Sequence, residues 1–386
     1  MKSDLLVLAG EHGTPLVVYN GGAVQRRIKA VHAAFEGEVH LLYATKANSH
    51  PDLLSLMAPE LDGADVTSAG ALEAAVESGF ESSRVQFTSP GKNGADLKTA
   101  LDAGATTVIG CSSESLDLAA LARERGIDPA SVPVLIRINP QQRIHAFRSA
   151  TGGVPSPFGI PEEEVAKHLS AVRAHGLRPR GLHVHRGSQC TSATAFSKHV
   201  DQVLTLAEEL HHKYDLPLHI NFGGGLGVAP TDSPRLPLES LGRRVARTLR
   251  AFRRAHPLAT FAIEPGRYLV SEAGTLLLKV VRRRVVRGTT FVVLDGGIDV
   301  FLFATQRMRH GPPPPMSNLS RPDAPSEIVT LVGPSCTSED TLAVGIPLPH
   351  LARGDILALG QSGAYAAGAS ISGFLGRAPA KEVVID

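Results

Sequence analysis

Short apolar runs alternate with stretches of helical periodicity over the first two thirds of the chain. Apolar runs of this length, ended by glycine, proline or polar residues, are typical of buried strands. We expect strands at residues 39–44, 63–68, 85–90, 106–112, 132–140, 181–188, 218–225 and 260–267. Helical spacing occurs between them at residues 71–78, 115–125, 162–175, 195–214 and 241–256, and before the first run at residues 23–35. Eight strand–helix units predict a (β/α)8 barrel, the TIM-barrel form of the α/β class.

The pattern changes after residue 273, where β-branched runs separated by turn residues replace the helical periodicity. These runs lie at residues 276–286, 290–294, 327–332 and 356–359, and they predict an antiparallel β domain. An early run at residues 14–19 is expected to join that domain or to link the two. We predict a barrel over residues 22–273, and a β sandwich or small β barrel from residues 1–21 and 274–386. The proline-rich stretch between residues 307 and 326 is expected to be a mobile loop.

Polar side chains and glycines gather where the predicted barrel strands end. In a (β/α)8 barrel the active site lies at the carboxyl ends of the strands, so these residues would share one rim. They are Lys46, Asp65, Ser68, Ser89, Cys111, Arg137, Asn139, His185, Ser188, Gly223, Gly224, Gly225, Glu264 and Arg267. The pattern therefore predicts a cofactor site at this rim.

Lys46 directly follows the first apolar run and precedes Ala47 and Asn48. A lysine at the mouth of a core strand is costly to bury. One reason to place it there is a Schiff base, which requires an amine that loses its proton easily. The alternative is a lysine whose aliphatic stem lines the strand end while its ammonium stays in water. The segment by itself leaves both interpretations open.

Two further motifs belong to the same rim. Gly223, Gly224 and Gly225 follow the seventh run, and glycines there let backbone amides approach a phosphate closely. Phosphate sites favour this corner of a barrel, although a glycine cluster taken alone is usually a turn. Glu264 and Arg267 end the eighth run; an arginine suits a phosphate, and a glutamate suits a protonated ring nitrogen. A salt bridge at the rim is the alternative for this pair.

Composition narrows the function classes. The 386 residues carry a formal net charge of +2, so neither nucleic acid nor a membrane surface is indicated as a partner. The sequence has no run of about 18 apolar residues and no signal-peptide pattern, which predicts a cytoplasmic protein without a membrane span. Cys111, Cys190 and Cys336 are far apart and outside any metal-ligand spacing, so we expect reduced thiols and no metal.

Six segments resemble, in order, the signatures of the barrel-type (fold type III) pyridoxal-phosphate decarboxylases, the family of diaminopimelate, ornithine and arginine decarboxylases. The first is YATKAN at residues 43–48, and the second is HVHRGSQ at residues 183–189, where the family has His-x-His-Ile-Gly-Ser-Gln. The others are the glycine run at 223–227, EPGR at 264–267, GPSC at 333–336 and GAY at 363–365. The resemblance covers residues 14–385, nearly the whole chain.

The resemblance implies pyridoxal 5′-phosphate as cofactor and a role for each matching residue. Lys46 would hold the cofactor as a Schiff base, His185 would stack on its ring, and Glu264 would pair with the ring nitrogen. Asp65 and Arg137 would line the ring near the lysine. The phosphate would be held by Ser188, Gly225, Gly266, Arg267 and Tyr365, with Gly224 also in contact with the cofactor.

The resemblance also implies a homodimer with shared active sites. Cys336 would be the acid that returns a proton to the substrate, reaching across the dimer interface into the partner's site. A lone cysteine is more often a buried small apolar residue than a catalyst. Here Gly333-Pro334 before it and Glu339-Asp340 after it predict an exposed turn, which favours the functional interpretation. We assign substrate contacts to Asp299, Ser338, Glu339 and Asp340.

The expected chemistry follows from the residue at the ring nitrogen. A protonated pyridine ring withdraws electrons, so the bond to an α-carboxylate can break, and Glu264 would keep that proton in place. Racemases on a similar barrel have an arginine at the nitrogen, which weakens the electron sink, so the glutamate favours decarboxylation. A barrel that only carries the cofactor would not need the last ~110 residues, a domain-sized piece. A purely structural role would leave Lys46 and Glu264 unexplained.

Two groups that diaminopimelate decarboxylases use to bind the distal end of their substrate are replaced in this sequence. Phe303 stands at the position of an arginine, and Thr337 stands at the glutamate of a Cys-Glu-Ser turn. The Leu302-Phe303 stretch instead resembles the branch that acts on conjugated or carrier-bound amino acids in siderophore and antibiotic pathways. We predict a decarboxylase of that branch. The alternatives are a diaminopimelate decarboxylase of lysine biosynthesis and an amino-acid racemase.

Overall fold

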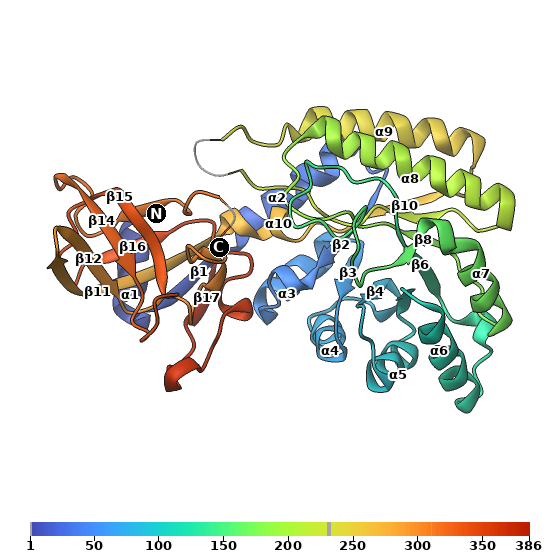
Figure 1. Ribbon diagram of the computed structural model, residues 1–386, viewed down its shortest axis with the longest axis horizontal. Coiled ribbons are helices and arrows are strands. Elements are labelled where there is room, and N and C mark those ends of the chain that lie inside the picture. Colours follow the sequence, from blue (N-terminus) through green and yellow to red (C-terminus); the bar gives the residue numbers. More distant parts are fainter. Residues whose placement is uncertain (1, 230–232, 310) are drawn as a thin grey trace. The chain divides into compact units, whose positions relative to one another are not determined.

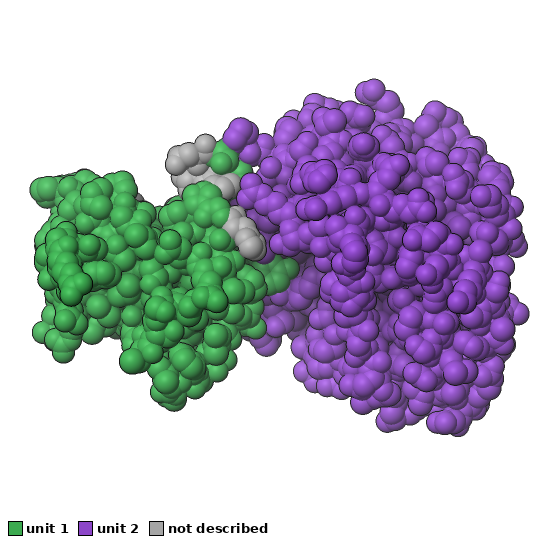
Figure 2. Space-filling view, in the orientation of Figure 1, with its two compact units in different colours: residues 1–24, 229–233, 269–386 green, residues 25–228, 234–268 purple. Residues whose placement is uncertain are grey.

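The computed structural model describes residues 2–229, 233–309 and 311–386. The chain divides into two compact units, drawn in different colours in Figure 2. The larger unit comprises residues 25–228 and 234–268, and the smaller one comprises residues 1–24, 229–233 and 269–386. Among the described residues, no helix is both long enough and apolar enough to cross a lipid bilayer.

The larger unit is a closed barrel of parallel strands, as the apolar runs predicted (Figure 1). Its strands are β2 (His40–Ala44), β3 (Gly63–Val66), β4 (Val85–Thr88), β5 (Thr106–Ile109), β6 (Val134–Asn139), β8 (Gly181–His183), β9 (His219–Asn221) and β10 (Thr260–Ile263). They follow the order β5-β4-β3-β2-β10-β9-β8-β6, and pairing of β5 with β6 closes the ring. The two-residue strand β7 (Ile160–Pro161) extends the pairing at the end of β6. The strands are shorter than the predicted runs because the chain leaves the ladder at the rim.

Helices surround this barrel (Figure 1). They are α2 (Gly21–Ala34), α3 (Pro51–Met57), α4 (Ala69–Glu77), α5 (Gly94–Ala103), α6 (Ser112–Glu124), α7 (Val165–Ala174), α8 (Ala193–Tyr214) and α9 (Leu238–Ala255), with the short α10 (Arg267–Val270) after the last strand. Helices α3 and α5 fall outside the predicted helical stretches. Local capping defines α5, because the side chains of Asn93 and Asp96 form a capping box and Gly104 ends the helix in the left-handed conformation.

The smaller unit is mainly antiparallel β structure, which confirms the predicted second β domain. It contains α1 (Lys2–His12) and the strands β1 (Leu16–Asn20), β11 (Gly274–Val286), β12 (Thr289–Leu294), β13 (Met316–Asn318), β14 (Ser326–Val332), β15 (Thr341–Pro349), β16 (Ile356–Leu359) and β17 (Lys381–Ile385). The strand order is β13-β16-β11-β12-β14-β15, and β1 pairs with both β11 and β17. The early run at residues 14–19 therefore belongs to this unit.

The proline-rich stretch between residues 307 and 326 is not a loop throughout, contrary to our expectation. Met316–Asn318 form β13 and pair with β16, and the Pro315 carbonyl accepts a hydrogen bond from the Gly360 amide at 2.8 Å. Leu319, just beyond β13, is buried. This segment forms a strand because it pairs with β16, and the proline content of the sequence does not predict that pairing. Residue 310 of the stretch lies outside the described residues.

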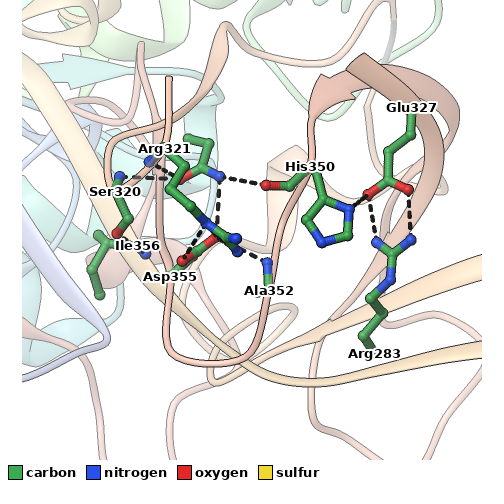
Figure 3. A network of polar contacts seen from close by, with 9 residues as sticks. Arg283, Ser320, Arg321, Glu327, His350, Ala352, Asp355 and Ile356 are labelled. Atoms are coloured by element: carbon green, nitrogen blue, oxygen red, sulfur yellow. Dashed lines mark hydrogen bonds and ion pairs between the residues drawn. The ribbon is translucent and has the colours of Figure 1, made fainter. Parts of the chain in front are cut away.

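Ion pairs connect the strands and turns of the smaller unit (Figure 3). Asp355 accepts a hydrogen bond from the Arg321 guanidinium at 2.6 Å and another from the Ala352 amide at 2.9 Å. Glu327 on β14 pairs with Arg283 on β11. Asp355 is largely buried, so its charge is stabilised by these donors rather than by water.

In the barrel unit, helices α2 and α9 approach each other at a glycine. A Cβ atom at Gly242 would lie 2.2 Å from the carbonyl oxygen of Ala34, the last residue of α2. Such a contact is far shorter than van der Waals packing allows. The absence of a side chain at Gly242 therefore sets how closely the two helices pack.

Replacing Gly242 with alanine should destabilise the barrel unit, because the new methyl group would collide with the Ala34 carbonyl. Overpacking of this kind lowers the free energy of unfolding by about 1–3 kcal/mol. Gly70 in α4 is the matched control: its Cβ position is open, so Gly70→Ala should leave stability unchanged or raise it by up to about 1 kcal/mol. Urea denaturation measures both variants. Equal effects of the two substitutions would refute the packing argument.

Candidate active site

Predicted site residues from five strands lie at the carboxyl ends of the barrel. Lys46 is in a 3₁₀ turn after β2, Asp65 is on β3, Arg137 is on β6, and His185 and Glu264 follow β8 and β10. Strands β3, β2 and β10 are neighbours, so Asp65, Lys46 and Glu264 share one part of the rim. The Nζ atom of Lys46 lies 3.8 Å from Oδ2 of Asp65. The lysine side chain is 41% exposed and the carboxylate is fully buried, so the amine is at the boundary between solvent and interior.

Glu264 is buried, and its Oε1 atom is surrounded by polar groups from three other strands. Gln86 on β4 donates from Nε2 at 2.6 Å, and Asn221 on β9 donates from Nδ2 at 2.8 Å. Nε2 of His183 on β8 lies 3.0 Å from the same oxygen. Asn221 also donates to Oε1 of Gln86 at 2.8 Å. This polar layer fixes the orientation of the carboxylate inside the barrel mouth.

The two buried carboxyl groups favour opposite protonation states. Burial and the neighbouring charge of Glu264 raise the pKa of Asp65 to about 7. Burial also works against ionisation of Glu264, but the contact with His183 and the positive charge of Lys46 outweigh it and keep the pKa of Glu264 below its usual range. Gln86 bridges the pair, with Nε2 3.2 Å from Oδ1 of Asp65. The site thus holds a lasting negative charge at Glu264 and a carboxyl that titrates near neutrality at Asp65.

His185 is held as a neutral imidazole. Burial lowers its pKa well below the usual value. Its Nδ1 accepts a hydrogen bond from the Gly224 amide at 3.0 Å, which leaves the ring proton on Nε2. A Cβ atom at Gly223, where φ is +67°, would lie 2.8 Å from the imidazole. The glycine run therefore lets the backbone lie directly against the histidine and fix its ring.

Other glycines keep side chains out of the rim. A Cβ atom at Gly224 would lie 2.3 Å from the carbonyl oxygen of Glu264, and one at Gly225 would lie 2.6 Å from the carbonyl oxygen of Gly187. A Cβ atom at Gly266 would lie 3.0 Å from the Cβ of Ala47 and 3.1 Å from the Cβ of Ala44. The rim here consists of closely packed main chain, the kind of surface that binds a phosphate through backbone amides.

The remaining predicted residues of the barrel lie on the same end of the strands. The guanidinium of Arg137 is buried and lies 4.7 Å from the ring centroid of Phe158. Ser188 follows β8, and its amide donates to the carbonyl of Arg148 at 2.8 Å. Arg267 opens α10, directly after β10 and Gly266. The barrel therefore places these three residues at the carboxyl ends of its strands.

The smaller unit holds the predicted cysteine and acidic residues. Cys336 is an exposed free thiol in the turn between β14 and β15. Asp340 ends this turn and is buried: Oδ1 accepts from the Ile298 amide and Oδ2 from the Ser335 amide, both at 2.7 Å. Asp299 is also buried and accepts from a backbone amide, at 2.8 Å. Both carboxylates, which we expected at the substrate, have oxygens bonded to main-chain amides.

Phe303 and Tyr365 lie side by side in this unit. Their ring centroids are 6.1 Å apart, with the ring planes at 65°. In the Cys336 turn, Glu339 forms an ion pair of 2.7 Å with Arg307. Ser338 uses its carbonyl to accept from the Thr341 hydroxyl at 3.1 Å. The predicted phosphate residue Tyr365 is thus next to the residue that replaces the expected arginine.

Gln86 and Asn221 were not predicted as site residues, and His183 was noted only as a motif residue without a role. A signal was present in each strand. Gln86 interrupts the apolar run Val-Gln-Phe-Thr, and Asn221 precedes Phe222 and the glycines. A buried amide inside a strand is costly unless it is hydrogen-bonded, so such a position indicates a polar partner in the interior. Only the closed barrel identifies that partner as Glu264.

The geometry suits a cofactor that is attached to a lysine and carries a protonated ring nitrogen. Lys46 offers a partly exposed amine, and Glu264 offers a buried anion at the barrel mouth. Oδ2 of Asp65 is buried and makes no hydrogen bond, with Nζ of Lys46 3.8 Å away, so it could accept a hydrogen bond from a bound polar group. The close-packed glycines of the rim fit a phosphate. These features agree with the pyridoxal phosphate expected from the resemblance.

Comparison with known proteins gives consistent matches over nearly the whole chain. The family model described as pyridoxal-dependent decarboxylase, pyridoxal binding domain, matches residues 21–271. The diaminopimelate decarboxylase of Deinococcus radiodurans is 32% identical over 377 residues, covering 97% of this chain and 91% of that protein. The L-glutamyl-BtrI acyl-carrier protein decarboxylase of Niallia circulans is 28% identical over 392 residues, covering 99% of this chain and 91% of that protein.

The fold also matches solved structures. The diaminopimelate decarboxylase of Helicobacter pylori, solved in complex with L-lysine, superposes with a TM-score of 0.88 at 26% identity. The superposition covers 99% of this chain and 94% of that chain. The fold of this chain is therefore shared by that enzyme over nearly the whole length of both chains.

The raised pKa of Asp65 predicts a pH dependence of stability in the cofactor-free protein. Its ordinary pKa is 3.8, so between pH of about 4 and about 7 the folded state keeps a proton that the unfolded state has lost. In this window Asp65 should lower the free energy of unfolding as pH rises, by up to about 1.4 kcal/mol per pH unit. Asp65→Asn should remove this part of the slope in urea denaturation. Asp117→Asn, at an exposed position on α6, is the control; an unchanged slope in Asp65→Asn would contradict the assignment.

Proposed function

The chain belongs to the pyridoxal-dependent decarboxylases of the diaminopimelate and ornithine decarboxylase family, and from this premise we propose that its substrate is an amino acid joined at its far end to a carrier or another group. It is a carboxy-lyase with pyridoxal phosphate as cofactor. The observation that supports the substrate proposal is the apolar ring of Phe303 beside Tyr365, where an arginine would bind a free distal carboxylate.

The residues of the barrel would hold the cofactor in the following way. Lys46 would bind it covalently through the partly exposed amine. Glu264 would accept a hydrogen bond from the ring nitrogen and keep the proton there, since its own pKa is held low. His185, fixed by the Gly224 amide, would pack on the ring. The phosphate would be bound by Ser188, Gly225, Gly266, Arg267 and Tyr365.

When bound, pyridoxal phosphate supplies an electron sink for the bond to the α-carboxylate. The chain supplies the remaining requirements. Glu264 keeps the sink protonated, and the buried neutral His185 adds no competing charge to the ring face. Cys336 would donate a proton to the substrate Cα after CO2 has left. This last step needs a proton donor, and Cys336 is an exposed free thiol.

Possible substitutes for the missing distal groups already have partners. Arg307 could replace the arginine at position 303, but it is paired with Glu339. Glu339 could replace the glutamate that the family has at position 337, but it is the partner of Arg307 in the same ion pair. Asp299 accepts a backbone hydrogen bond and is buried. The buried, hydrogen-bonded Asp299 is therefore a poor substitute, whereas the exposed Arg307–Glu339 pair holds its two residues only weakly.

The chemistry restricts where a carrier can be attached. The α-amine must be free to react with the cofactor, and the α-carboxylate leaves as CO2. A carrier or conjugate can therefore be joined only through the side chain, at the end that Phe303 would contact. The relative from Niallia circulans, whose name gives an amino acid on an acyl-carrier protein, agrees with such a substrate. Siderophore and antibiotic pathways are the proposed context.

Diaminopimelate decarboxylation is the second candidate, and a specific observation favours it. The Deinococcus radiodurans relative has the higher identity of the two, 32% against 28%. Against it stand Phe303 and Thr337, which cannot form the charge-assisted contacts that a distal zwitterion requires. Kinetics on defined substrates separate the two candidates.

We predict that meso-diaminopimelate is a poor substrate. Each lost charge-assisted contact to a buried zwitterion costs about 1.5–3 kcal/mol, or roughly 10- to 150-fold in kcat/KM. Steady-state CO2 release should be measured on diaminopimelate, ornithine, lysine and glutamate carrying a thioester on its side-chain carboxyl. The thioester should be preferred. A kcat/KM for diaminopimelate of about 10⁴ M⁻¹s⁻¹ or more would return this chain to lysine biosynthesis.

Restoring the missing groups tests the same argument from the other side. The double substitution Phe303→Arg with Thr337→Glu should raise kcat/KM for diaminopimelate by at least about tenfold. Phe303→Leu is the matched control, because it removes the ring without adding a charge. An equal gain in both variants would show that space, rather than charge, limits the free substrate.

We also predict that two chains share each active site. An inactive Lys46→Ala chain mixed with an inactive Cys336→Ala chain should regain activity, because a hybrid dimer contains one site with both residues. With equal mixing, half of the dimers are hybrids with one intact site of two, giving about a quarter of full activity. CO2 release after subunit exchange measures the recovery. If exchange is confirmed by mass spectrometry and no activity returns, the shared-site proposal is wrong.

A further inference from the structure

The segment between β6 and β7, which we call the 140–159 loop, packs against the residues that would hold the cofactor. The Thr151 hydroxyl donates to the carbonyl of His185 at 3.3 Å, and the Ser188 amide donates to the carbonyl of Arg148 at 2.8 Å. The ring of Phe147 lies so near Gly225 that a Cβ there would be 2.9 Å away. Any movement of this loop would therefore change the positions of the residues at the cofactor site.

Arg186 connects this loop to helix α8. Its side chain is buried, and its guanidinium donates to three groups. Nε donates to Nδ1 of His199 at 2.9 Å, and Nη2 donates to Oε1 of Gln202 at 2.9 Å, both on α8. Nη1 donates to the carbonyl of Gln142 in the loop. The backbone takes part as well, since the Arg186 carbonyl accepts from the amides of Thr151 and Gly152 at 2.9 and 3.1 Å.

The acceptors around Arg186 are neutral and oriented. Nε2 of His199 lies 2.8 Å from the carbonyl of Phe222 and donates to it, so Nδ1 is left as an acceptor for the arginine. Burial lowers the pKa of His199 to about 3, and the imidazole is uncharged at neutral pH. Gln202 is itself fixed, because its Nε2 donates to Oε1 of Gln142 at 2.8 Å. The network therefore fits a planar group, such as a guanidinium, that donates hydrogen bonds in three directions.

Burying an arginine among neutral acceptors is expensive compared with an apolar residue of similar volume. Burial lowers the pKa of Arg186 to about 10, with the charge of Glu162 as a partial compensation, so the group stays positive at neutral pH. The family motif has isoleucine at this position. We therefore expect the guanidinium of Arg186 to fix the positions of the groups around it rather than to raise the stability of the fold.

We propose that Arg186 is a positioning residue for the cofactor site: it fastens the 140–159 loop to α8 and so holds His185, Ser188 and Gly225 in place. The guanidinium is bonded to His199, Gln202 and Gln142, so its role would be indirect. The guanidinium acts on the loop through the carbonyl of Gln142. The amides of Thr151 and Gly152 are bonded to the backbone carbonyl of Arg186, which side-chain variants retain. Loss of the guanidinium should loosen the loop and weaken cofactor binding while the barrel stays folded.

The test uses the holoenzyme of Arg186→Met, which has similar length and no donors. Hydrogen–deuterium exchange of peptides covering residues 141–153 should become at least about tenfold faster, as expected for the loss of bonds from a charged donor. The dissociation constant of pyridoxal phosphate, measured by absorbance after dialysis, should rise by at least about tenfold. Unchanged exchange, or faster exchange with unchanged cofactor affinity, would overturn the proposal.

Two further variants keep the test decisive. Arg173→Met is the matched control: Arg173 on α7 donates to the Tyr214 carbonyl, away from the loop, so its loss should affect stability but not cofactor affinity. Equal weakening of cofactor binding by both substitutions would overturn a specific role of Arg186. Arg186→Lys keeps the charge but replaces the planar fork with a single ammonium. This variant replaces Arg186→Met in the test if the methionine variant does not fold. If Arg186→Lys has the same hydrogen–deuterium exchange and the same cofactor affinity as the wild type, the proposal is likewise overturned.

Discussion

The hydrogen bonds to the buried carboxylate of Glu264 are the interaction on which the barrel site depends. An ionised carboxylate in a protein interior is strongly disfavoured unless several donors surround it. Gln86 and Asn221 supply those donors from β4 and β9, and His183 adds a contact from β8. Because these strands are far apart in sequence, only a fully closed barrel assembles the cage. Burial, together with the charge at Glu264, in turn raises the pKa of Asp65.

A second constraint is the close approach of main-chain segments at the rim. Gly223 leaves room for the imidazole of His185, and Gly224 leaves room for the carbonyl of Glu264. The amide of Gly224 then fixes the tautomer of the histidine. One run of glycines thereby controls both the space for a phosphate and the tautomer of the histidine expected on the ring. Electrostatics and packing at this site are consequences of the same backbone geometry.

In the smaller unit, carboxylates organise turns. Asp340 binds the amides of Ile298 and Ser335 and so joins the Cys336 turn to the segment after β12. Asp355 does the same for the turn before β16 (Figure 3). Such anchored turns can present a thiol and an aromatic ring in defined positions while the residues between them vary. Substrate preference in this family member would then change through Phe303 and Thr337 without disturbing the fold.

The sequence by itself determined the element types and the residues with chemistry. The alternation of apolar runs and helical stretches predicted the barrel, because parallel strands buried on both faces need continuous apolar segments. Lys46 and Glu264 were visible because each ends a strand. Only the tertiary structure decided which polar side chains meet. Gln86 and Asn221 bind Glu264 from other strands of the barrel, and Arg186 donates a hydrogen bond to Gln142 in the 140–159 loop. Strand β13 was hidden for the same reason, since its pairing with β16 is a long-range contact that local residue pattern does not encode.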